Sequence, residues 1–261
     1  MYINSKFSSS NYSYRIKQIE YIILHYTEIP FEEALAKLTD VQSEVSAHYL
    51  IKEDGEILQL VDDDKVAWHA GESSWQNSTN LNQNSLGIEM DNFGVSEFSS
   101  KQMKSCIELC CYLVNKYELY FANIIGHSDI APDRKLDPGI FFDWQMLAKN
   151  GLGIWHNINH SKDSKKTILH KFGQKNLAIK KLQQDLYTLG YKINISGQID
   201  IQTNNVIRAF QSRFCAELIH SKGGIDFYQN ALSIYDWDSF SEQVLQKLIF
   251  VLQNGSAGIV K

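Results

Sequence analysis

The first 150 residues alternate between short apolar runs and amphipathic segments. Runs rich in β-branched and aromatic residues predict buried strands, at 21–27, 85–90 and 123–125. Two more strand-like runs, 47–52 and 56–61, flank the pair Asp54-Gly55, which is typical of a β-hairpin turn. Apolar side chains three to four residues apart predict helices, at 31–38, 99–117 and 142–150. Strands that alternate with helices predict an α/β domain with a mixed central sheet flanked by helices.

The last third of the chain has a different pattern. Three amphipathic segments predict helices that pack as a small three-helix bundle, at 177–189, 203–214 and 239–252. Gly190, directly after the first of them, is a typical helix stop. The stretch before this region is polar. We therefore predict a first domain over 1–158, a linker over 159–175 and a helical domain over 176–261.

The composition narrows the class of protein. With 44% hydrophobic and 21% charged residues, the chain is typical of a soluble globular protein. Its formal net charge of −5 argues against nucleic acid as a partner. No run approaches the roughly 20 apolar residues of a transmembrane helix. Residues 1–14 are polar and lack the apolar core of a secretory signal, so we expect a cytoplasmic protein. The alternative is the cell envelope or export by a non-classical route.

The four cysteines predict no disulfide framework. Cys106, Cys110 and Cys111 fall in one predicted helix, and Cys215 lies far away in the sequence. Because no CxxC pair accompanies them, buried apolar thiols are favoured over a metal site. The pattern carries no signal of oligomeric state.

Polar side chains stand at the ends of three predicted strands. His25 lies near the end of the first strand, Glu89 near the end of the second, and His127 follows the third. Strand ends of this kind meet at one rim of a sheet, where ligands bind. His127 also opens the segment 126–139, which is polar and stiffened by two prolines. A stiff polar loop at the end of a buried strand is a usual place for a functional site.

His127 and Asp137 in this loop are candidate metal ligands, and Lys135 can reach the same pocket. Together with His25 they give two histidines and a carboxylate, a typical catalytic zinc set. Zinc lowers the pKa of a bound water to about 7. A nearby carboxylate such as Glu89 can take a proton from water, and a lysine ammonium can stabilise an oxyanion. Together, these groups imply hydrolysis of an amide bond. The alternatives are a solvated surface loop, histidines that only pack at the rim, and Glu89 in a salt bridge.

Four local motifs carry a resemblance to a known family. They are Ile23-Leu24-His25-Tyr26-Thr27; Ser46-Ala47-His48-Tyr49-Leu50-Ile51; Trp68-His69-Ala70-Gly71 with Ser74-Trp75, Asn82 and Ser85-Leu86-Gly87-Ile88-Glu89; and His127-Ser128-Asp129-Ile130-Ala131-Pro132 with Arg134-Lys135 and Asp137-Pro138-Gly139. In this order, over roughly residues 15–155, the chain resembles the zinc-dependent N-acetylmuramoyl-L-alanine amidases of the AmpD/AmiD type. These are relatives of the peptidoglycan-recognition proteins.

The resemblance implies roles for the candidate residues of the rim. It implies one zinc ion per chain, held by His25, His127 and Asp137. It implies Glu89 as the general base and Lys135 as the partner of the oxyanion. The implied reaction is hydrolysis of the amide bond between N-acetylmuramic acid, including its 1,6-anhydro form, and L-alanine in peptidoglycan or muropeptides. The alternatives are a non-catalytic peptidoglycan-recognition protein and a zinc peptidase that acts on stem peptides.

The resemblance also extends to residues around the rim. It implies that Trp68, His69 and Asn82 lie near the substrate. One branch of the family has a catalytic tyrosine where this chain has Ala47. The resemblance therefore implies that Glu89 acts as the base, as in the AmpD branch. We expect the next residue, His48, to be a buried structural histidine rather than a ligand.

The helical region resembles the peptidoglycan-binding domain of bacterial wall hydrolases. The matching residues are Leu182-Gln183, Leu186, Leu189-Gly190-Tyr191, Gly197, Thr203 and Ala209-Phe210-Gln211. A purely structural or dimer-forming bundle is the alternative.

Overall fold

A six-stranded mixed sheet forms the centre of the first domain in the computed structural model, which describes residues 1–158 and 166–254. Its strands are β1 (Ile3–Asn4), β3 (Tyr21–Tyr26), β4 (Tyr49–Ile51), β5 (Ile57–Gln59), β9 (Ser85–Met90) and β10 (Ile124–Gly126). They lie in the order β1-β5-β4-β9-β3-β10. Strands β4, β9, β3 and β10 run parallel, whereas β5 is antiparallel to β4 and parallel to β1. The predicted α/β class with a mixed sheet is confirmed.

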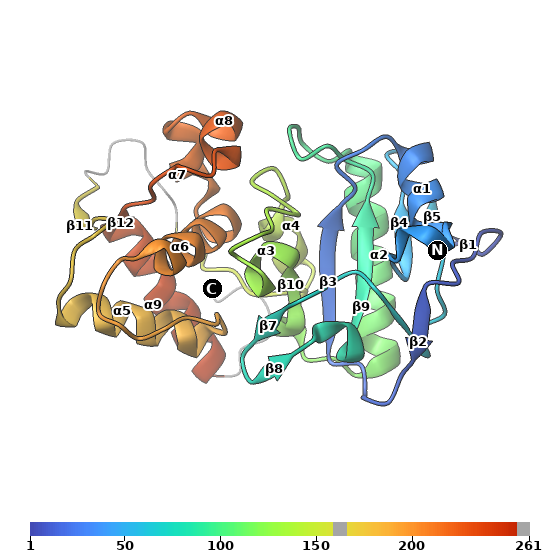
Figure 1. Ribbon diagram of the computed structural model, residues 1–261, viewed down its shortest axis with the longest axis horizontal. Helices are drawn as coiled ribbons and strands as arrows, with labels where there is room; N and C mark the ends of the chain where they lie inside the picture. Colours follow the sequence, from blue (N-terminus) through green and yellow to red (C-terminus); the bar gives the residue numbers. More distant parts are fainter. Residues whose placement is uncertain (159–165, 255–261) are drawn as a thin grey trace.

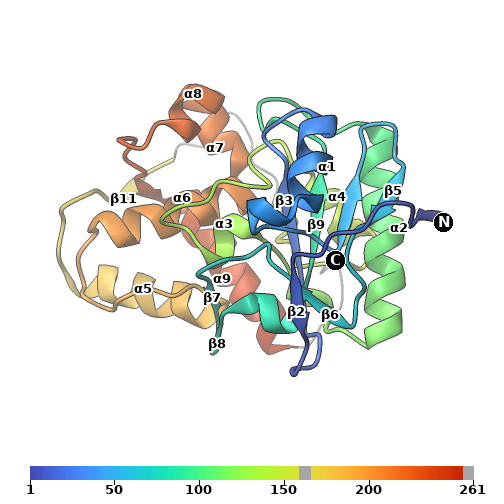
Figure 2. The same cartoon turned by 45° about the vertical axis from the view of Figure 1, so that its right-hand side comes forward.

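Helices flank this sheet on both faces. They are α1 (Phe31–Thr39), α2 (Ser100–Tyr117), α3 (His127–Ile130) and α4 (Trp144–Lys149). Helix α2 begins where the Ser99 side chain accepts a hydrogen bond from the backbone N–H of Gln102 at 3.1 Å. Its Met103, Ile107 and Cys110 pack on one face of the sheet, and Figure 2 shows the helix running beside the strands.

The strands divide their side chains between two cores. Ile22 and Leu24 of β3 pack in the core under α2, whereas Ile23 packs in the core on the opposite face. Because side chains of a strand alternate between faces, His25 shares the face of Ile23, away from α2. This alternation decides which face of the sheet carries the polar site.

Short elements make the connections of the first domain. Strand β2 (Tyr12–Tyr14) pairs with β6 (Lys65–Ala67), and β7 (Ser74–Trp75) pairs with β8 (Ser78–Thr79), both antiparallel. Three 3-10 turns are η1 (Val41–Ser43), η2 (Leu81–Asn84) and η3 (Phe121–Asn123).

The C-terminal region is helical, as the sequence predicts. Its elements are α5 (Leu177–Leu189), α6 (Ile201–Phe214), α7 (Ala216–Ser221), α8 (Gly224–Gln229), α9 (Ser239–Gln253), β11 (Ile168–His170) and β12 (Trp237–Asp238). The three predicted helices correspond to α5, α6 and α9, and each begins at an Asn or Asp cap, at Asn176, Asp200 and Asp238. Helices α7 and α8 are additions to the predicted bundle. They are only six residues long, too short to show a helical period in the sequence.

The stretch expected to be a linker, 159–175, has structure in its second half. Residues 159–165 lie outside the described part of the chain. Strand β11, at 168–170, pairs with β12 next to α9. Gly173 then donates a backbone hydrogen bond to Ile199 at 2.8 Å. The sequence does not indicate this strand, because it is only three residues long and has polar residues on both sides.

The helical region shares a hydrophobic core with the face of the sheet that carries His25. Ile23 and Ile125 of the sheet belong to the same buried cluster as Tyr191 and as Phe210 of α6. Figure 1 shows α5, α6 and α9 side by side on the flank of the sheet next to α3. Within the described residues, none of the helices combines the length and apolar character that crossing a membrane requires.

Trp75 of β7 is the most direct test of this shared core. Its ring lies edge-on to Tyr191, with the ring centres 5.0 Å apart, and is 3% exposed. We expect Trp75→Ala to lower the free energy of unfolding by about 3–5 kcal/mol, because it leaves a large cavity between the two regions. The control Tyr187→Ala removes a half-exposed ring of α5 and should cost less than about 0.5 kcal/mol. Urea denaturation measures both, and equal losses would contradict the shared core.

Candidate active site

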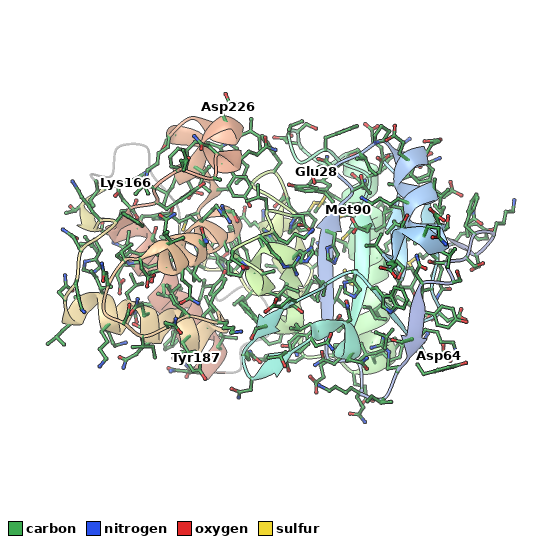
Figure 3. The ribbon with its side chains drawn as sticks, viewed as in Figure 1. Glu28, Asp64, Met90, Lys166, Tyr187 and Asp226 are labelled. Carbon is green, nitrogen blue, oxygen red and sulfur yellow. The ribbon has the colours of Figure 1, made fainter. Side chains whose placement is uncertain are left out.

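The parallel register brings the predicted rim residues together. His25 lies directly opposite Glu89 in the β3–β9 pair, and Leu24 lies opposite Gly126, the residue before His127. The carboxyl ends of three parallel strands therefore meet at one edge of the sheet. Figure 3 marks this edge by Met90, at the end of β9, and Glu28, just beyond β3.

Three buried side chains converge at this edge. The Nδ1 atoms of His25 and His127 lie 2.9 Å apart, and each lies 2.9 Å from Oδ2 of Asp137. Each residue offers one ligand atom to a set that fits within 4.8 Å. The sequence-predicted ligands, 112 residues apart at the extremes, are thus brought together in one cluster.

The opposite ring nitrogen of His127 shows where its proton lies. Its Nε2 atom lies 3.2 Å from the carbonyl oxygen of Ala70, which only accepts hydrogen bonds. Nε2 therefore carries a proton, and in the neutral tautomer of the ring Nδ1 presents a lone pair to the cluster.

A longer chain of hydrogen bonds fixes the proton of His25. Ser85 donates its hydroxyl proton to the carbonyl oxygen of Leu81 at 2.6 Å, so its oxygen accepts from Nε2 of His69 at 3.2 Å. Nδ1 of His69 is then an acceptor, and Nε2 of His25 donates to it at 3.0 Å. Nδ1 of His25 is left with a lone pair directed at the cluster. Outer partners of this kind commonly orient metal-ligating histidines.

The cluster is therefore three electron-pair donors without a proton among them. Burial, with the neighbouring His127, lowers the pKa of His25 to about 4, so its ring is neutral near pH 7. Three such donors at 2.9 Å repel one another unless a cation lies between them. The donor set fits a metal ion.

Glu89 of β9 lies next to this cluster, opposite His25 of β3. Its Oε1 lies 4.0 Å from Nδ1 of His25, and its side chain is 15% exposed. Its Oε2 atom is buried and has no hydrogen-bond partner among the described residues. Burial, together with the carboxylate of Asp137, raises the pKa of Glu89 well above its usual value. A carboxyl group that lies beside a metal-ligand cluster and has one oxygen without a partner is available for proton transfer.

A cleft of about 300 Å³ opens over the cluster. Glu89, Lys135 and Trp68 line it, together with residues of α1. Within the described residues, no hydrogen bond or ion pair holds the ammonium of Lys135. The cleft is at the small end of the range for ligand sites, and it places a cation and an aromatic ring beside the metal-ligand cluster.

His69 and Asn82 support the site, and their expected place near the substrate stays a prediction. His69 reaches the cleft wall but is only 9% exposed, and both of its ring nitrogens are engaged behind His25. Asn82 accepts hydrogen bonds from the backbone N–H groups of His69 and Ala70 at 3.1 and 2.7 Å. Both residues thus support the site from behind. Sequence reasoning gave Ser85 no role, because no local pattern connects a serine with a histidine 16 residues earlier.

His48 and Gly87 complete the support of this wall. His48 is fully buried and accepts a hydrogen bond from the backbone N–H of Gly87 at 3.0 Å. A Cβ atom on Gly87 would lie 2.4 Å from the ring of His69, so the strand needs a glycine here. His48 is outside the metal-ligand cluster, as expected for a structural histidine.

Fold and site together define a class: an α/β protein with a metal-ligand trio and a carboxylate at the carboxyl rim of its sheet. Residues 15–140 match the family model described as N-acetylmuramoyl-L-alanine amidase. The AmpD amidase of Haemophilus influenzae is 32% identical over 153 aligned positions, in a match that covers 51% of this chain and 83% of that protein. The chain belongs to the N-acetylmuramoyl-L-alanine amidase family, and the resemblance of the four motifs is confirmed.

Two further comparisons concern the AmiD amidase of Escherichia coli. It is 40% identical over 154 aligned positions, in a match that covers 53% of this chain and 55% of that protein, so the match spans about half of this relative. A solved structure of AmiD with the substrate anhydro-N-acetylmuramic acid-L-Ala-D-gamma-Glu-L-Lys is similar at a TM-score of 0.70 and 28% identity. It covers 93% of this chain and 91% of that chain. Residues 175–217 also match a model described as a putative peptidoglycan binding domain.

Ser85 tests the chain of hydrogen bonds behind His25. We expect Ser85→Ala to weaken metal binding about tenfold, because His69 loses the acceptor that fixes its tautomer. Competition between the protein and a chromophoric chelator for Zn²⁺ measures the dissociation constant. The matched control is Ser46→Ala, which removes another buried hydroxyl, bonded to the backbone of Asn11 and Trp68. If both variants bind Zn²⁺ as the wild type does, Ser85 has no part in holding the ligand.

Proposed function

We propose that this chain is a zinc-dependent N-acetylmuramoyl-L-alanine amidase. It hydrolyses the amide bond between N-acetylmuramic acid and L-alanine in peptidoglycan or muropeptides, with intact and 1,6-anhydro muramyl ends as candidate substrates. One observation carries the proposal: two imidazole lone pairs and a carboxylate oxygen meet at 2.9 Å beside an unpartnered carboxyl oxygen, in a chain of the amidase family.

Zinc fits the donor set. Two histidine nitrogens and one aspartate oxygen are typical ligands of a catalytic zinc site, which keeps one position open. His25, His127 and Asp137 would hold the ion. When bound, zinc supplies a Lewis acid that polarises a carbonyl group and makes water acidic at neutral pH.

Glu89 is the general base of the proposed reaction. Its carboxylate takes a proton from the attacking water and hands it to the leaving amine of L-alanine. The buried oxygen without a partner supports this role, because a carboxylate already held by a hydrogen bond or salt bridge is a poorer base. The alternative for Glu89 was a salt bridge. Among the described residues, no Lys or Arg side chain forms one with it.

Lys135 and Trp68 have the remaining roles. The ammonium of Lys135 stabilises the negative charge that develops on the oxygen of the attacked carbonyl. Its position on the cleft wall without an ion-pair partner supports this role. Trp68 presents an aromatic ring at the same wall and offers the substrate an apolar surface, while its backbone is held by Ser46.

The reaction itself gives the first test. We expect the zinc-loaded protein to release an intact stem peptide from a muramyl peptide, because the bond to be broken joins the lactyl group to L-alanine. Mass spectrometry of the products identifies the bond that is cut. A chelator should abolish the release and added Zn²⁺ should restore it. Cleavage within the stem peptide would instead indicate a peptidase, and zinc binding without any cleavage a recognition protein.

Glu89→Gln gives the second test. The amide cannot accept a proton from water, so kcat should fall by roughly 100- to 10,000-fold. Zinc affinity should stay near the wild-type value, because Glu89 is outside the ligand trio. His127→Ala is the contrasting variant, which should lose stoichiometric zinc. Full hydrolysis by Glu89→Gln would show that another group is the base.

A further inference from the structure

Side chains of the C-terminal helices hold the loop that carries the active-site residues. This loop, 126–139, contains His127, Lys135 and Asp137. Helix α3, its first turn, packs against α6, and Figures 1 and 2 both show the two helices side by side. The loop is thus enclosed between the sheet and the helical region.

The first point of attachment is Asp129, a carboxylate with no exposed surface. Its Oδ1 accepts a hydrogen bond from the hydroxyl of Tyr191, and its Oδ2 accepts one from the guanidinium of Arg213, both at 2.6 Å. Arg213 also donates to the carbonyl oxygen of Ile124, in β10, at 3.0 Å. One buried arginine of α6 therefore ties the last strand of the sheet to the turn that follows His127.

The second and third points lie further along the loop. Arg208 of α6 donates to the carbonyl oxygen of Pro132 at 2.5 Å. Tyr228 of α8 donates its hydroxyl to the carbonyl oxygen of Leu136 at 2.6 Å. Leu136 stands between Lys135 and Asp137, so this hydrogen bond fixes the peptide unit that joins Leu136 to the metal ligand Asp137, directly after the proposed oxyanion partner.

These hydrogen bonds do more than hold the C-terminal region against the first domain. The four side chains from the C-terminal region are almost completely buried: Tyr191, Arg208, Arg213 and Tyr228. Each of them donates to this loop, on backbone carbonyls and one carboxylate. Buried charged and hydroxyl groups are retained at a cost unless they are paired, and here their partners are points of the catalytic loop.

We infer that the C-terminal helices are a positioning element of the active site, and that Tyr228 is a positioning residue for Lys135 and Asp137. This inference rests on the proposed function for its catalytic part. The family model that matches this region describes peptidoglycan binding. On our inference, the region also maintains the geometry of the metal ligands.

Tyr228→Phe is the variant that tests this inference. It removes only the hydroxyl that holds Leu136. We expect the dissociation constant for Zn²⁺ to rise about tenfold, as for other outer partners of a metal site. Backbone amides of 128–137 should exchange hydrogen faster, and kcat should fall with KM nearly unchanged, because the groups that act on the transition state lose their alignment.

The matched control is Tyr235→Phe. Tyr235 is also buried, and its hydroxyl also donates to backbone carbonyls, but these belong to Phe227 and Tyr228 within the helical region. It should keep wild-type zinc affinity and loop exchange. Arg208→Gln, which releases Pro132, provides a second variant at another point of the loop and should act in the same direction as Tyr228→Phe.

The readouts separate the possible failures. If Tyr228→Phe and Arg208→Gln equal Tyr235→Phe in zinc affinity and in hydrogen exchange of the loop, the inference is wrong. It is equally wrong if the changes follow the melting temperature alone across all three variants. If the wild type binds zinc but has no amidase activity, the proposed function fails, while zinc affinity and hydrogen exchange still decide whether the helices position the loop.

Discussion

The site depends on one electrostatic constraint: two imidazole lone pairs and one carboxylate oxygen face one another without a proton between them. Left alone, such a cluster is repulsive. The two lone pairs stay directed at the cluster because the other nitrogen of each ring forms a hydrogen bond outside it. The carbonyl of Ala70 holds the proton of His127, and His69 with Ser85 holds that of His25. The hydrogen bonds behind the cluster thus direct both lone pairs toward its centre.

The sheet is arranged to satisfy this constraint. Parallel pairing of β3 with β9 and β10 puts the side chains of His25, Glu89 and His127 at one rim. The alternation of β3 sends its apolar neighbours into two separate cores and leaves the polar residue on the face opposite α2. Gly87 completes the arrangement, because only a residue without a side chain leaves room for the ring of His69.

The helical region extends the same constraint to the other end of the chain. A ligand on a loop is only as well placed as the loop itself. The loop from Gly126 to Gly139 is held at Asp129, Pro132 and Leu136 by side chains that come from beyond residue 190. The boundary between the two sequence domains therefore does not coincide with a boundary in the packing.

The sequence by itself determined the elements and the candidate ligands. Strand and helix periods are local, so β3, β9, α2 and the three long C-terminal helices could be predicted within a few residues. The residue types of His25, Glu89, His127 and Asp137, set in family motifs, indicated the chemistry as well. The six-residue helices α7 and α8 and the strand β11 were missed, because so few residues show no period.

The tertiary structure alone decided which residues support the site. His69 lines the cleft, and its ring nitrogens form hydrogen bonds with His25 and Ser85. The hydrogen bond from Tyr228 to Leu136 joins residues 92 positions apart. A hydrogen bond depends on distance and direction in space, and a sequence pattern specifies neither for residues that are far apart along the chain.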